Sequence, residues 1–125
     1  MTMWKGQGSD YIYFMPMSLT RVNDAMKNGI TNELDLIRNK EIWPEFSDKD
    51  IKVWANEERI DILSITKVPD FLAEVDGEKL FRPSYIVSIP KGFERKTIKV
   101  QIKDTIYRNN EKIIERGEGF YFLDS

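Results

Sequence analysis

The feature that most constrains the fold is a long segment of alternating residues, from residue 96 to residue 108. Its even positions hold the apolar residues Ile98, Val100, Ile102 and Ile106, whereas most of its odd positions are polar. A period of two over this length is typical of a β-strand with one buried face and one wet face. The segment therefore predicts a long strand in a sheet that covers a hydrophobic core.

A return strand is expected directly after this segment. Asn109 and Asn110 can adopt the positive φ values that a tight hairpin turn needs. Apolar and aromatic residues then resume, and Gly117 and Gly119 indicate a bulge or kink within the run. Residues 96–123 thus predict an antiparallel hairpin as the body of the protein.

Two to three helices are expected upstream of the hairpin. Ser18 is a suitable N-cap for a helix over residues 19–28. Residues 32–41 fit either a helix or a strand, with a helix preferred. Ser47, with an acidic residue three positions later and flanking apolar residues, has the pattern of a capping box with a hydrophobic staple. This pattern predicts a helix over residues 48–58, with Trp54 on its inner face.

The remaining apolar runs predict short strands, which Pro69 and Pro83 should interrupt and Asp76-Gly77 should connect by a tight turn. The expected strands cover residues 11–14, 60–65, 71–75, 79–81 and 85–89. The predicted fold class is α+β, with an N-terminal short strand and two to three helices packed on a largely antiparallel sheet of five to six strands. Residues 1–125 are expected to form a single globular domain, with residues 1–9 as a flexible arm.

The composition narrows the chemistry, because the chain has neither cysteine nor histidine. Without these residues there is no disulfide, no thiol nucleophile, no Ser-His-Asp triad and no usual zinc site. We therefore expect a protein that is not an enzyme, with no catalytic residue, no cofactor and no metal site.

The N-terminal residues lack the pattern of a signal peptide, and no apolar run reaches the roughly 20 residues of a membrane helix. A soluble, cytoplasmic protein without a membrane partner is expected. Alanine occurs only three times, while isoleucine, lysine and asparagine are abundant, as AT-rich coding produces. This bias suggests a bacteriophage or a low-GC bacterium as the source, and the host cytoplasm as the location of a phage-encoded protein.

Charge is distributed unevenly along a chain with a net charge of −2. Residues 91–108 hold six basic and two acidic side chains, whereas residues 24–82 are acidic overall. The odd face of the long strand, which comprises Lys99, Gln101, Lys103 and Tyr107, is therefore a candidate partner-binding surface. The alternative is that its lysines serve only solubility.

A second candidate surface is the loop at residues 43–46. Trp43 and Phe46 could line a ligand pocket or contact a partner there, although aromatic residues beside a helix start also serve as core.

Two short segments resemble known families. The sequence R-G-E-G-F at residues 116–120 is similar to part of the RNA-recognition motif, but Glu118 occupies a position that is usually aromatic. The strand–helix pattern of residues 13–30 resembles the opening of ADP-ribosyltransferase-like folds, without the histidine often found there or a Glu-x-Glu signature. These resemblances imply RNA binding and ADP-ribosyl transfer, respectively.

The leading functional expectation is a small binding protein that occupies another protein's surface. It could be a phage-encoded inhibitor, an immunity-type protein or a component of a phage particle. The first alternative is nucleic-acid binding through the basic strand face. The second is an enzyme of a carboxylate-based or ADP-ribosyltransferase-like type.

Overall fold

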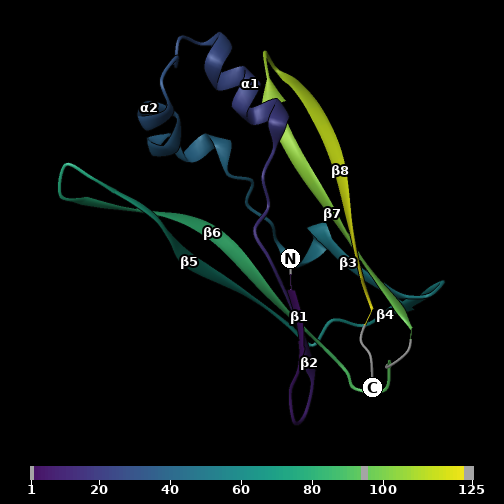
Figure 1. Ribbon diagram of the computed structural model, residues 1–125. Coiled ribbons are helices and arrows are strands. Elements are labelled where there is room, and N and C mark those ends of the chain that lie inside the picture. Colours follow the sequence, from purple (N-terminus) through teal and green to yellow (C-terminus); the bar gives the residue numbers. More distant parts are fainter. Residues whose placement is uncertain (1, 94–95, 123–125) are drawn as a thin grey trace. The chain divides into compact units, whose positions relative to one another are not determined.

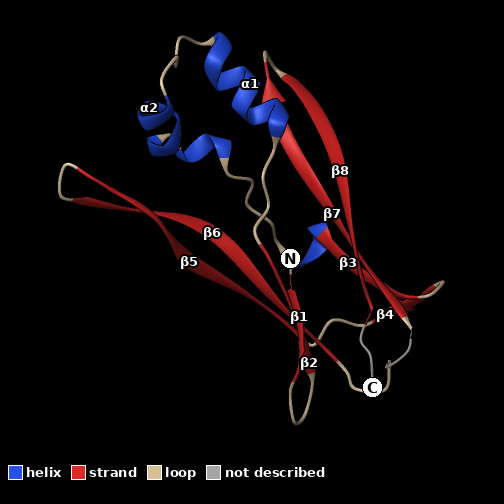
Figure 2. Ribbon diagram, in the orientation of Figure 1, coloured by secondary structure: helices blue, strands red, loops and turns tan. Residues whose placement is uncertain are grey.

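The computed structural model describes residues 2–93 and 96–122, and these contain eight strands, two α-helices and two short 3₁₀ helices (Figures 1 and 2). The strands are β1 Thr2–Lys5, β2 Asp10–Phe14, β3 Ile51–Ala55, β4 Glu58–Ile60, β5 Ser64–Val75, β6 Glu78–Ile89, β7 Thr97–Arg108 and β8 Glu111–Phe122. The helices are α1 Leu19–Lys27 and α2 Glu33–Arg38, with the 3₁₀ helices η1 Lys40–Ile42 and η2 Asp48–Asp50.

The chain divides into two compact units, which are described separately. The first unit comprises Met1–Phe14, Phe46–Thr66 and Tyr85–Ser125, and the second comprises Met15–Glu45 and Lys67–Ser84. Strands β5 and β6 each begin in one unit and end in the other.

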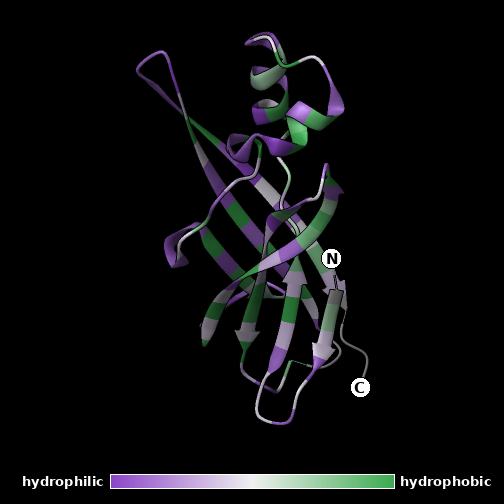
Figure 3. Ribbon diagram, turned by 90° about the vertical axis from the view of Figure 1, so that its left-hand side faces the viewer, coloured by the Kyte–Doolittle hydropathy of each residue, from purple (hydrophilic) through white to green (hydrophobic). Residues whose placement is uncertain are grey.

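The first unit is built from two antiparallel sheets that share one core. One sheet has the order β1-β2-β6-β5, and the other has the order β4-β3-β7-β8. Strand β6 contributes only its Tyr85–Ile89 part, which pairs with β2, to this unit. The core side chains of the first sheet are Ile12, Phe14, Tyr85, Val87 and Ile89, and those of the second are Ile51, Val53, Ala55, Ile60, Ile98 and Val100. Hydrophobic and hydrophilic bands alternate along the strands in Figure 3, as expected for sheets with one buried face.

The β7–β8 hairpin confirms the central prediction from the sequence. Val100 is only 1% exposed, and its neighbours at odd positions point to the other face. Asn109 and Asn110 make the turn with φ values of 50° and 66°. The predicted bulge is wrong, because pairing runs without a break from Thr97 opposite Phe122 to Arg108 opposite Glu111. Gly117 instead leaves room for Ile102, whose Cγ1 would lie 3.2 Å from an added Cβ.

The predicted helix over residues 48–58 is also wrong. The capping signal is real, since the Ser47 N–H donates to Asp50 Oδ2 at 2.9 Å, but it stabilises only the single turn η2. Strand β3 follows at once, with Ile51, Val53 and Ala55 buried against β7. Apolar residues at every second position bury well in a strand, so tertiary packing outweighs the local helix signal.

The second unit contains the expected upstream helices. Helix α1 begins after Ser18, whose Oγ accepts from the Arg21 N–H at 3.2 Å, and Gly29 follows its end with a φ of 101°. The ambiguous segment 32–41 forms α2 and most of η1, so the helical prediction is confirmed there. Ala25, Ile42 and Trp43 form the centre of a small core, and partly buried residues that include Leu72 of β5 pack against it.

The strands of the β5–β6 hairpin are longer than predicted because neither proline ends them. Pro69 lies in β5, the edge strand of its sheet, and Pro83 lies in β6 before the part that pairs with β2. A proline without a ladder N–H is tolerated at such positions. The turn at Asp76-Gly77 is as expected, with φ values of 51° and 78°. The predicted strand over 60–65 is divided between the end of β4 and the start of β5.

The architecture agrees with the predicted fold class only in its coarse features. It is largely antiparallel, with two α-helices, but its strands form two four-stranded sheets rather than one sheet of five to six strands. Within residues 1–9, which were expected as an arm, Thr2–Lys5 form β1 along β2, and Trp4 stacks on Tyr11 with ring centroids 5.5 Å apart.

Candidate nucleic-acid interface

The candidate site is the outer face of the β4-β3-β7-β8 sheet, called here the outer face. Because directly paired residues project from the same side of a sheet, the pairing register shows which side chains share it. The outer-face residues are Lys52, Trp54, Arg59, Lys99, Gln101, Lys103, Thr105, Tyr107, Lys112, Ile114, Arg116, Glu118 and Phe120. All of them belong to the first unit.

The outer face is strongly basic although the whole chain has a net charge of −2. Six of its thirteen side chains are lysine or arginine and one, Glu118, is a carboxylate, while the Asp50 carboxylate lies beside the face with its Oδ1 3.9 Å from Lys103 Nζ. Residues two apart in a strand are about 6.6–7 Å apart, so these cations form a grid rather than a cluster. A polyanion with repeated charges can therefore contact several of them at once.

An aromatic and basic row crosses the full width of the sheet. Arg59, Trp54, Lys99 and Phe120 are direct neighbours on successive strands. The Lys99 Nζ lies 5.2 Å from the centroid of the Trp54 ring, and the Arg59 Cζ lies 5.7 Å from it. These cation–π contacts hold both charges beside the indole, while the Phe120 ring is 63% exposed.

The next rows combine free and paired charges. Gln101 Nε2 donates a weak hydrogen bond to Glu118 Oε1 at 3.4 Å. Glu118, the one carboxylate among the thirteen outer-face residues, therefore has a partner on the neighbouring strand. Lys103 Nζ lies 3.9 Å from Asp50 Oδ1, a long ion pair that neutralises part of its charge. Arg116, directly opposite Lys103, is exposed and has no side-chain partner among the described residues.

Beyond Ile102 the hairpin continues as a two-stranded ribbon, because β3 pairs with β7 only as far as that residue. Tyr107 and Lys112 are opposite each other near its tip, and Tyr107 is 77% exposed. Ile114, opposite Thr105, is 41% exposed. Exposed apolar and aromatic groups therefore alternate with the cations along the outer face.

The structure brings together four of the six residues that the sequence singled out. Lys99, Gln101, Lys103 and Tyr107 share the outer face as expected from their spacing.

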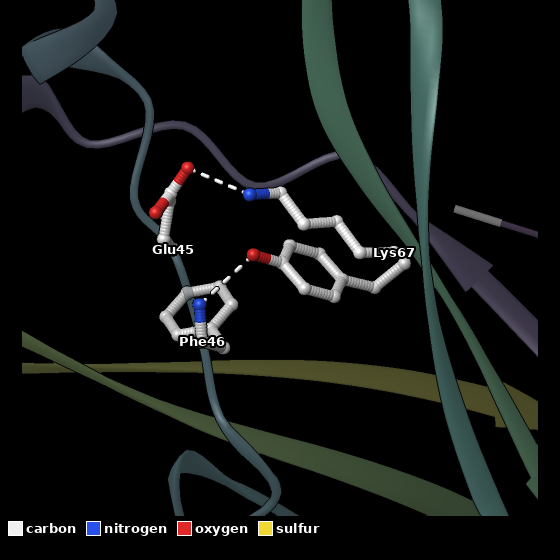
Figure 4. Close-up of polar contacts among 4 residues, drawn as sticks. Glu45, Phe46 and Lys67 are labelled. Carbon is white, nitrogen blue, oxygen red and sulfur yellow. Dashed lines mark hydrogen bonds and ion pairs between the residues drawn. The ribbon is translucent and has the colours of Figure 1, made fainter.

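The other two predicted residues are not part of it. Trp43 is 9% exposed and belongs to the second unit. Phe46 is packed on the core residue Tyr85, whose hydroxyl accepts from the Phe46 N–H at 2.8 Å (Figure 4). Core packing, the alternative weighed for these two aromatics, therefore describes Phe46 and also Trp43, which belongs to the small core of the second unit.

The contribution of β3, β4 and most of β8 to the outer face was not predicted from the sequence. Trp54 was assigned to the inner face of a helix, yet it lies on the outer face of a strand next to Lys99. The signal that could have placed it is the alternation of Ile51, Val53 and Ala55 with Lys52 and Trp54, which has the same period as the long strand.

The segment that resembles the RNA-recognition motif lies wholly within β8. Its Arg116, Glu118 and Phe120 point outward and its two glycines lie between them. The segment therefore supplies one cation, one carboxylate and one exposed ring to the outer face.

Metal sites and membrane-spanning helices are two further features to consider in the described part of the chain. Its His, Cys, Asp and Glu side chains include no group of three or more that could hold a metal ion. None of its helices is long and apolar enough to cross a membrane. Comparison of the chain with protein-family models, with curated proteins and with solved structures gave no match.

Proposed function

We propose that the protein binds single-stranded nucleic acid on the outer face. The observation that supports this most directly is the composition of that face, with six cations, one carboxylate and exposed aromatic rings. Proteins that bind single strands combine cations that follow the phosphates with aromatic side chains on which bases stack. Lys99 and Phe120 provide both kinds of contact in adjacent positions.

A single strand fits this surface better than a duplex does. The major groove of a duplex admits a helix or a two-stranded ribbon, whereas the Trp54 and Phe120 row lies on the four-stranded part of the sheet. Bases that are already unpaired can reach the exposed Phe120 ring without the cost of opening a duplex.

The test is the binding of fluorescein-labelled oligothymidylate, followed by fluorescence anisotropy. In the test variant, Lys99→Glu is combined with Lys103→Glu. Its matched control combines Lys27→Glu with Lys79→Glu, which changes the net charge equally through exposed lysines of the second unit. We expect the test variant to lose at least about tenfold in affinity and the control to stay within about twofold. Equal losses in both would assign the binding to net charge and contradict the proposal.

Aromatic stacking is tested separately by Phe120→Ala. Loss of one stacked base costs about 1–3 kcal/mol, so affinity should fall about 5- to 150-fold. Phe71→Ala is the matched control, because Phe71 is similarly exposed, at 60%, but lies on β5 in the second unit. A labelled duplex of the same length should bind more weakly than the single strand; tighter binding of the duplex would favour insertion of the β7–β8 ribbon into a groove instead.

A protein partner is the second candidate, in line with the expectation from the sequence. The specific observation in its favour is that Ile114 and Phe120 expose apolar surface among cations on β8, the edge strand of its sheet. An acidic protein surface with an apolar centre would complement this arrangement. Affinity capture with and without nuclease separates the two candidates, since a protein partner is retained after nuclease treatment and bound nucleic acid is lost.

A further inference from the structure

The second unit contains a pocket that the proposed function does not use. Its volume is about 380 Å³, within the range of about 300–1,000 Å³ that is usual for small-ligand sites. One wall comes from the segment between residues 40 and 45, and the other from β5 and β6. All the lining residues belong to the second unit.

Arg82 is a cation of the pocket whose guanidinium is held by two contacts. Its guanidinium carbon lies 4.4 Å from the centroid of the Trp43 ring, and its Nη2 donates to the Pro16 carbonyl oxygen at 2.9 Å. The stack and this hydrogen bond hold the guanidinium plane in place. A guanidinium has five N–H donors, and Nη1 has no partner among the described residues, so Arg82 can still donate to an anion.

Two lysines and one carboxylate add to the charge of the pocket. Lys67 Nζ is bound to Glu45 Oε1 at 2.7 Å, so this pair is neutral overall (Figure 4). The Lys40 ammonium has no partner among the described residues. Arg82 and Lys40 together therefore leave an excess of positive charge beside the neutral pair, which favours an anionic ligand.

The rest of the lining is apolar and partly flat. Trp43, Phe81, Pro69 and Pro83 contribute ring surfaces, and Phe81 is 52% exposed. A purely inorganic anion would contact the cations but leave these rings in water. A ligand with a planar apolar body and one anionic group satisfies both parts of the lining.

We infer that this pocket binds a small aromatic anion, a phosphate or carboxylate attached to a ring system, whose charge meets Arg82 and Lys40. The inference is independent of the nucleic-acid interface, because no residue is shared between the pocket and the outer face.

The test uses 1-naphthyl phosphate as the probe and ¹H–¹⁵N correlation spectra as the readout. Saturable shifts are expected at the indole N–H of Trp43 and not at that of Trp54, which lies on the outer face. Neutral 1-naphthol lacks the charge and inorganic phosphate lacks the ring, so each should bind at least about tenfold more weakly. If either matches the probe, the combined recognition of ring and charge is refuted.

Lys40→Gln should weaken binding of the probe about fivefold, whereas Lys27→Gln, an exposed lysine outside the pocket, should leave it unchanged. Lys40 is exposed, so its replacement leaves the fold intact, and unshifted spectra of the free variant verify this. Equal weakening by both substitutions would show attraction by net charge alone. Shifts at Trp54 rather than Trp43 would place the probe elsewhere and overturn the inference.

Discussion

Asp10 is a buried charged residue whose ion pair should contribute strongly to the stability of the fold. Its side chain is fully buried in the first unit, and its Oδ1 lies 3.0 Å from Lys91 Nζ. Neither carboxylate oxygen meets the geometry of a hydrogen bond within the described residues, so the ion pair is the main compensation for its burial. Removing one partner of a buried pair leaves an uncompensated charge, which is usually far more costly than losing both.

Lys91→Met should therefore lower the free energy of unfolding by about 3–5 kcal/mol. Urea denaturation measures this change. The double variant with Asp10→Asn should recover a large part of the loss, because the buried charge is then absent as well. An unchanged urea midpoint for Lys91→Met would mean that the ion pair does not stabilise the fold.

Tyr121 presents the opposite case, a buried group that is neutral at ordinary pH. Its hydroxyl is buried without a hydrogen-bond partner among the described residues, and burial raises the pKa of Tyr121 from 10.0 to about 12. Below pH 10 the phenol is protonated in both the folded and the unfolded chain, so its contribution to stability is fully present there. As the pH rises from 10 to 12 the unfolded chain loses this proton first, and stability falls.

Tyr121→Phe should consequently reduce the loss of stability between pH 10 and pH 12, with little or no loss at pH 7. Thermal melts across this range provide the measurement. Tyr107→Phe, at a position that is 77% exposed, is the control and should follow the wild-type profile. The same alkaline profile in all three proteins would exclude Tyr121 as a source of the pH dependence.

At the scale of the elements, the alternation along β7 divides the residues of the core from those of the outer face. Val100 points into the core between the two sheets, and Gln101 points to the outer face. Substituting aspartate at these adjacent positions tests the register with the same chemical change on opposite faces.

Val100→Asp should unfold the first unit or destabilise it by several kcal/mol, because it buries an unpaired charge. Gln101→Asp should shift the melting temperature only slightly. Circular dichroism melts of the two variants distinguish these outcomes. A folded Val100→Asp variant that melts like the wild type would refute the register on which the outer face is based.

The β7–β8 hairpin could be predicted from the sequence because it follows from local rules. Its strands have a strict period of two, and its turn has two asparagines that tolerate positive φ. Four of the five outer-face residues of β7, namely Lys99, Gln101, Lys103 and Tyr107, followed directly from that period.

The elements that could not be predicted depend on distant partners. After Ser47 the local signals favoured a helix, and only pairing with β7 makes Ile51–Ala55 a strand. Similarly, Pro83 can remain in a strand because β6 does not pair with β2 at that position. The extent of this pairing cannot be read from the residues around Pro83. As a result, Trp54 was placed on the wrong element and its part in the candidate site was missed.

At the scale of the whole molecule, the two units are connected by β5 and β6, which run from one into the other. A single cooperative domain was expected from the length of the chain, and this stays a prediction for the two units. Disruption of one unit should then remove the strand ends on which the other depends.

Urea unfolding followed by the indole N–H signals of Trp43 and Trp54 tests this prediction, since each tryptophan reports on a different unit. We expect the two signals to disappear with the same midpoint. A lower midpoint for Trp43 would show that the second unit opens independently, while the first stays folded.

If the outer face contacts a phosphate backbone, its binding of a single strand must weaken as the salt concentration rises. Each phosphate neutralised on a single strand contributes about −0.7 to the slope of log K against log salt concentration. For three to four contacts from the six cations of the outer face, anisotropy titrations with oligothymidylate between about 50 and 200 mM salt should give a slope of about −2 to −3. In the Lys99→Glu and Lys103→Glu variant the slope should become shallower by about 1.4. A wild-type slope near zero, or the same slope in the wild type and this variant, would show that the lysines of the outer face do not contact phosphates.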